Sequence, residues 1–157
     1  DSVQAAADAD RYRKAYEDML HELQVNPKQP EQRHWYHKIT STHSFWRRHE
    51  RVANRFQLQQ TYPNIPIEVH VARLGDVACV SVPFEYYLDF GLRIQARSKA
   101  VQTFVIQLAG SGSYLPTLRS VAGGGYGAVP ASTEVGPESG QQLVEWAVDH
   151  IDKLWKQ

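Results

Sequence analysis

The stretch IEVHVARLGDVACVSVPFEYYLDFG, residues 67–91, constrains the fold of this chain more than any other. Its β-branched residues occur on both sides of the Gly75-Asp76 pair, which predicts two strands joined by a tight turn. Pro83 lacks an N–H group for a strand ladder and therefore marks the end of the second strand. Glu85 follows two residues later, just past the strand end, in the kind of position where active-site groups are often mounted. We therefore predict a hairpin that presents Glu85 as a candidate functional residue.

Length and composition indicate a globular protein of about one domain. The chain has 157 residues, of which 42% are apolar, and its 17 basic and 17 acidic residues cancel. This balance gives no overall field that would favour nucleic acid or an anionic membrane as a partner. No apolar run approaches the ~20 residues of a membrane span, so we predict no transmembrane segment. The single cysteine, Cys79, excludes an internal disulfide, and we expect it to be a buried, inert thiol.

Two amphipathic helices are predicted before the central hairpin. Apolar and aromatic residues recur at helical spacing in residues 2–24 and again from about Glu31 to Gln60. Asn26-Pro27 and Pro30 separate them, and Tyr62-Pro63 ends the second. We expect residues 1–62 to form a helical hairpin and residues 63–157 to form an α/β portion, together making one domain.

The rest of the chain adds a strand, further helices and a long loop. We predict a helix over 85–98, a strand over 102–108 and a final helix opened by Gly136-Pro137. Between the last two lies the glycine-rich stretch 109–127, in which Pro116 to Ala122 can form a helical turn. The predicted fold class is α+β (or α/β), a helical hairpin followed by a small sheet with flanking helices, within a larger α/β domain.

Four segments carry a resemblance to a known family. They are RLGDVACVSVPFE (73–85), TFVIQLA (103–109), SYLPT (113–117) and GGYG (124–127). In this order they resemble the C-terminal part of the neutral (alkaline, non-lysosomal) ceramidases and their bacterial ceramidase-like relatives. The resemblance runs from about Ile65 to the C-terminus. The short sequence after the terminal helix favours the bacterial branch, whose substrates need not be ceramide.

The resemblance implies a zinc-dependent amide hydrolase. In that family two histidines, a glutamate and a tyrosine hold the metal, and Glu85 and Tyr126 match the last two. Tyr114 matches a tyrosine close to the site, where we expect it to line or hydrogen-bond the substrate as a catalytic residue. Zinc accepts such ligands, keeps a position for water and polarises the amide carbonyl. A lipid-like amide substrate and a secreted or periplasmic location are further implications of the resemblance.

The chain also departs from the family pattern. The family's P-G-E and Y-E appear here as Pro83-Phe84-Glu85 and Tyr126-Gly127. None of the seven histidines matches the family's zinc histidines, which lie in an N-terminal portion together with a serine-containing motif. Two ligands make an incomplete zinc site. We therefore expect the remaining ligands to come from another chain or from sequence outside this one.

Other interpretations of the same residues stay open. Glu85 could cap the following helix, where the dipole favours a negative charge, and Tyr126 could be a packing anchor of its loop. His34 and His37 lie one turn apart and could share a metal, although surface histidines explain them as well. The Trp-rich second helix could instead make the chain a non-catalytic interaction module that packs on a partner chain. Nucleic acid could also be contacted by four arginines of this helix, which are Arg47, Arg48, Arg51 and Arg55.

Overall fold

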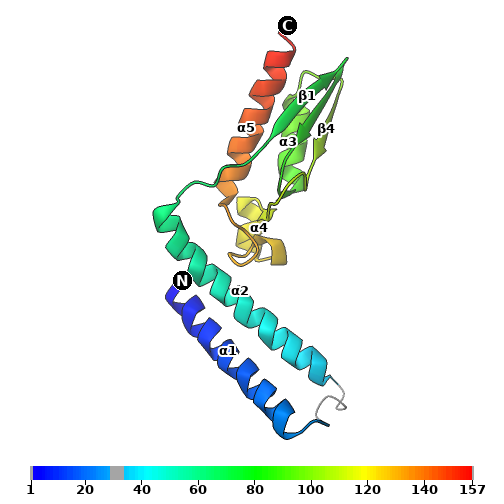
Figure 1. Cartoon of the computed structure of the whole chain (residues 1–157). Helices are drawn as coiled ribbons and strands as arrows, with labels where there is room; N and C mark the ends of the chain where they lie inside the picture. Colours follow the sequence, from blue (N-terminus) through cyan, green and yellow to red (C-terminus); the bar gives the residue numbers. More distant parts are fainter. Residues whose placement is uncertain (1, 29–33, 157) are drawn as a thin grey trace. The chain divides into compact units, whose positions relative to one another are not determined.

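The computed structural model describes residues 2–28 and 34–156 and has an α+β fold, as the sequence predicts (Figure 1). The chain divides into two compact units, residues 1–64 and 65–157. No helix among the described residues combines the length and the apolar character that crossing a membrane requires.

The first unit is the predicted helical hairpin. Helix α1 spans Ser2–Val25 and helix α2 spans Trp35–Thr61. The proposed start of the second helix at Glu31 lies outside the described residues. The two helices meet through a ladder of aromatic contacts: Tyr12 stacks on Phe45 at 5.3 Å, and the rings of Tyr16 and Trp46 lie 5.8 Å apart. The helical spacing of the aromatic residues thus places them along one seam between the helices.

The second unit contains the predicted strand hairpin and its turn. Strand β1 (His70–Leu74) runs antiparallel to β2 (Val77–Ser81), and Leu74 pairs with Val77 across the turn. Gly75 has φ 61°, a conformation that glycine adopts without strain. Strand β4 (Gln102–Ile106) pairs with β2 in parallel, which gives the order β1-β2-β4.

The structure corrects the residues that follow the hairpin. The helix predicted over 85–98 begins three residues later in the structure, where α3 spans Leu88–Arg97. Glu85 instead begins a two-residue strand, β3 (Glu85–Tyr86), which pairs in parallel with β5 (Tyr114–Leu115). Neither short strand was predicted, because two residues are too few to show an alternating pattern. Cys79 is half-buried in β2 and not fully buried as expected.

The glycine-rich stretch contains short elements that lead into the last helix. Helix α4 spans Leu118–Gly123, the 3₁₀ turn η2 spans Tyr126–Ala128, and α5 spans Pro137–Leu154. Helices α3 and α5 pack against the same face of the sheet, because their buried residues share one core with Ala78 and Val80 of β2. On the surface, Arg97 of α3 donates two hydrogen bonds to the carboxylate of Glu145 in α5 and lowers its pKa to about 2.

Helix α5 lies directly against α3 at Gly140. A Cβ atom at this position would lie 2.3 Å from Cζ of Phe90, whose ring is only 2% exposed. The hydroxyl of Tyr86 donates a 2.8 Å hydrogen bond to the carbonyl of Gly140, and its ring stacks on that of Phe90 at 4.9 Å. Gly140 therefore joins α5, α3 and β3 at one point of the core.

We predict that Gly140→Ala destabilises the protein by about 1–3 kcal/mol, because the added methyl group must displace a buried ring. Gly91→Ala is the matched control: Gly91 lies within α3 and a Cβ there meets no atom within 4 Å. That substitution should stabilise by up to ~1 kcal/mol through helix propensity. Urea unfolding followed by circular dichroism measures both, and equal effects of the two substitutions would contradict the packing described above.

Candidate functional site

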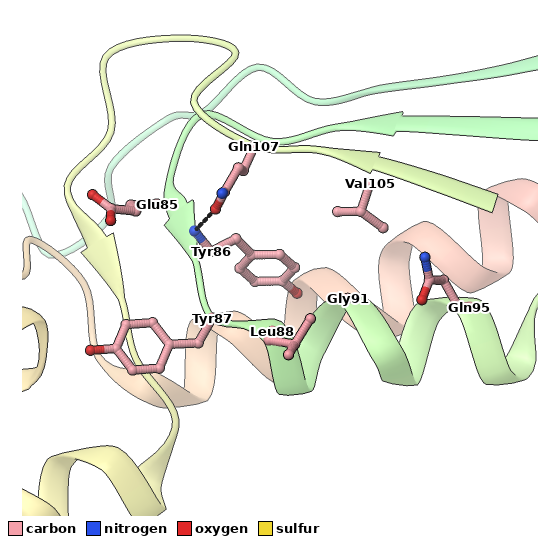
Figure 2. A pocket seen from close by; sticks show the side chains of 8 residues that line it. All are labelled: Glu85, Tyr86, Tyr87, Leu88, Gly91, Gln95, Val105 and Gln107. Atoms are coloured by element: carbon pink, nitrogen blue, oxygen red, sulfur yellow. Dashed lines mark hydrogen bonds between the residues drawn. The ribbon is translucent and has the colours of Figure 1, made fainter.

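The site begins at strand β3, which holds Glu85 on its solvent side. Successive strand residues point to opposite faces. Tyr86 is buried in the core, whereas Glu85 and Tyr87 are half-buried on the other side of the strand (Figure 2). The N–H of Tyr86 donates to Oε1 of Gln107 at 3.1 Å. The Gln107 side chain therefore satisfies a backbone donor on the edge of β3 that does not pair with β5.

Strand β5 places Tyr114 directly beside Glu85. The two residues are register partners in the parallel pair, and the N–H of Glu85 donates to the carbonyl of Ser113 at 3.1 Å. A hydrogen bond from the Tyr114 hydroxyl to the Glu85 carboxylate raises the pKa of Tyr114, and desolvation and the negative charge of Glu85 raise it further. The structure thus brings two of the three predicted site residues into direct contact.

Tyr126 is the third predicted site residue and lies against Tyr114. Its ring meets that of Tyr114 edge-to-face, with centroids 5.8 Å apart and planes at 90°. The side chain is 70% exposed, so this ring contact leaves most of Tyr126 accessible to solvent. Tyr126 begins η2, which follows Gly124 in the left-handed conformation at the end of α4.

Tyr87 completes the cluster and was missed by the sequence analysis. A Cβ atom on Gly127 would lie 2.5 Å from Cδ1 of Tyr114 and 2.8 Å from the hydroxyl oxygen of Tyr87. The two tyrosines therefore flank the same buried glycine. The only sequence signal for Tyr87 was its position two residues after Glu85, which places both on one side of an extended segment.

Phe84 and Gly127, which differ from the motifs of the ceramidases, both occupy buried positions. Phe84 is 3% exposed and belongs to the hydrophobic core. Gly127 is buried, and the contacts given above leave no room for a side chain. A glutamate at position 127 would displace Tyr114. The observed positions of Tyr114 and Tyr87 therefore require a glycine at this point.

Glu85 does not cap helix α3. The N-cap residue of that helix is Tyr87, and no side chain caps it by a hydrogen bond. Glu85 therefore does not occupy the N-cap position of this helix. The carboxylate is directed to the tyrosines instead.

A pocket of about 410 Å³ opens beside this cluster. Glu85 and Tyr87 lie at one end of the pocket, and Gln95 and Val105 lie at the other (Figure 2). Leu88 and Gly91 of α3 form part of its wall. The side chains of Glu85 and Tyr87 point away from Gln95 and Val105 (Figure 2), so the pocket lies next to the cluster, between β3, α3 and β4.

The described residues contain no group of three or more histidine, cysteine, aspartate or glutamate side chains that could hold a metal ion. His34 and His37 are exposed on the hairpin, in a different unit from Glu85. Comparisons with protein-family models, with curated proteins and with solved structures found no match to this chain.

We predict that Glu85→Ala shifts the titration of Tyr114 to lower pH. The acceptor of its hydrogen bond and the adjacent negative charge both raise the pKa of Tyr114, so their removal lowers it towards the ordinary pKa of a tyrosine. Tyrosine ring NMR signals followed against pH measure the shift, with Tyr114→Phe to assign the signal. Glu68→Ala, at an exposed carboxylate that pairs with His70, is the control and should leave Tyr114 unchanged. An unshifted titration in Glu85→Ala would contradict the hydrogen bond.

Proposed function

We propose that this chain is the C-terminal portion of a zinc-dependent amide hydrolase that resembles neutral ceramidase and cleaves a lipid-like N-acyl amide. The observation that carries the proposal is the contact between Glu85, Tyr114 and Tyr126. Three separate motifs single out these residues, and nothing in the motifs themselves requires the residues to be neighbours. Their meeting at one point supports a shared role.

The oxygen atoms at this point suit part of a zinc site. Zinc accepts carboxylate oxygen together with nitrogen ligands, and catalytic sites hold it with three protein groups and a water. Because the described residues provide no complete set, the proposal assigns the remaining ligands to another chain or to sequence outside this one. Zinc bound there would lower the pKa of its water towards ~7 and polarise the amide carbonyl.

The positions of Tyr114 and Tyr126 relative to Glu85 favour one of them as the second zinc ligand. The motif comparison points to Tyr126, whereas the hydroxyl of Tyr114 already shares a hydrogen bond with the Glu85 carboxylate. Two ligands of one metal ion must approach each other closely, and Tyr114 satisfies this condition in the described arrangement. We therefore propose Tyr114 as the stronger ligand candidate, with Tyr126 at the exposed rim, where it can contact substrate.

The adjacent pocket is consistent with the proposed substrate class. Its volume of about 410 Å³ lies within the range of small-molecule sites. Leu88 and Val105 line the pocket and can contact an apolar chain whose amide group lies at the neighbouring Glu85–Tyr114 cluster. An N-acyl amide carries both parts.

The test uses the chain together with the polypeptide that supplies the remaining ligands. We predict that Glu85→Gln lowers both the zinc content and the rate of N-acyl amide hydrolysis. The loss of rate should be at least ~100-fold, beyond the 10–100-fold expected for a group that only hydrogen-bonds to a metal ligand. Elemental analysis and a fluorogenic N-acyl amide provide the two measurements.

Separate tyrosine variants decide the second ligand. Tyr114→Phe should lose zinc together with activity, whereas Tyr126→Phe should keep zinc and change mainly the KM. Glu68→Gln, at an exposed carboxylate 83% accessible to solvent, should behave as wild type. Full zinc content and activity in Glu85→Gln would refute the proposed function, and the opposite pattern in the two tyrosine variants would return the ligand role to Tyr126.

A further inference from the structure

The helical hairpin has an open groove along one side. Its volume is about 750 Å³, and Tyr12, Met19 and Phe45 are among the residues that line it. Phe45 remains 45% exposed although its ring stacks on Tyr12. The groove therefore presents aromatic and apolar surface from both helices to solvent.

The hairpin buries few side chains of its own. Among its described residues, only Ala5, Ala9 and Trp35 are buried. Helices in proteins derive most of their stability from packing of an apolar face, and two helices alone share only one seam. Further packing against the groove would supply the burial that the isolated hairpin lacks.

The two helices of the hairpin carry opposite charge. Helix α1 has five acidic and three basic side chains, whereas α2 has five basic and one acidic. An interface between identical copies must be complementary to itself. The hairpin meets this condition, because the acidic α1 of one copy can lie beside the basic α2 of another.

Two groove residues indicate the relative position of the copies. Glu22, in the last turn of α1, and Lys38, in the first turn of α2, both line the groove. Neither forms an ion pair within the part of the chain that the structure describes. A two-fold axis along the helices keeps both inter-helix connections at one end, and it brings each Glu22 to the level of Lys38 in the second copy.

We propose that a second copy of this chain packs its hairpin into the groove and forms an antiparallel four-helix bundle. Each α1 then has an α2 on both sides, one from its own hairpin and one from the second copy, which is the up-down arrangement of many four-helix bundles. Tyr12, Met19 and Phe45 form the new seam, and Glu22 pairs with Lys38 across it. This dimer does not depend on the proposed zinc chemistry.

Sedimentation of the full chain provides the first test. The wild-type chain at micromolar concentration should sediment with twice the 17.9 kDa mass of one chain and dissociate on dilution. Glu22→Lys should weaken the dimer about tenfold, because by symmetry it replaces two attractive pairs with two repulsive ones. Glu17→Lys makes the same charge change at another exposed position of α1, outside the groove residues, and should leave the dimer unchanged.

A charge swap separates pairing from misfolding. The double variant Glu22→Lys, Lys38→Glu should restore the wild-type dissociation constant, and far-UV circular dichroism checks the helix content of each variant. A wild-type chain that sediments as a monomer overturns the proposal. A chain that associates only with the polypeptide completing the zinc site, and not with a second copy of itself, overturns it too. Equal behaviour of Glu22→Lys and Glu17→Lys, or a double variant no tighter than Glu22→Lys, overturns it as well.

Discussion

The close approach of α5 to α3 at Gly140 is the constraint on which the candidate site depends. The ring of Phe90 occupies the space that a side chain at position 140 would need, and the Tyr86 hydroxyl bonds the Gly140 carbonyl. These contacts hold Tyr86 inside the core. Because neighbouring strand residues face opposite ways, a fixed Tyr86 directs Glu85 to the opposite face, where its register partner Tyr114 also lies. The orientation of the proposed ligand is thus decided by packing on the other side of its strand.

The polar contact at the site has a direct electrostatic consequence. The Tyr114 hydroxyl donates a hydrogen bond to the Glu85 carboxylate, which stabilises the protonated hydroxyl and raises its pKa. A cation at the same point would reverse this effect, because positive charge favours the phenolate. In the proposed zinc site, binding of the metal ion would therefore release the proton of the Tyr114 hydroxyl. Tyr87 and Tyr126 surround the pair with further hydroxyl groups.

Much of the scaffold could be predicted from local pattern. Gly75-Asp76 between β-branched runs gave the hairpin turn correctly, and Gly136-Pro137 gave the start of α5. Strands β3 and β5 could not be predicted in this way. Each has two residues, and their pairing joins positions 85 and 114, so it depends on contacts that are distant in sequence. The late start of α3 has the same cause, since the pairing with β5 keeps Glu85 extended.

For the candidate site too, the sequence indicated which residues to consider but not how they are arranged. Motif resemblance selected Glu85, Tyr114 and Tyr126 but could not say which side chains touch. That depended on the parallel register of β3 and β5 and on a buried glycine, Gly127, beneath two tyrosine rings. Tyr87 carried no motif and was found only through this packing. The helical hairpin is a different case. The helical spacing of its aromatic residues predicted the seam between the helices, whereas the groove beside that seam depends on how far the two helices cover each other. The site and the groove therefore rest on separate contacts within separate units, so each proposal can fail without weakening the other.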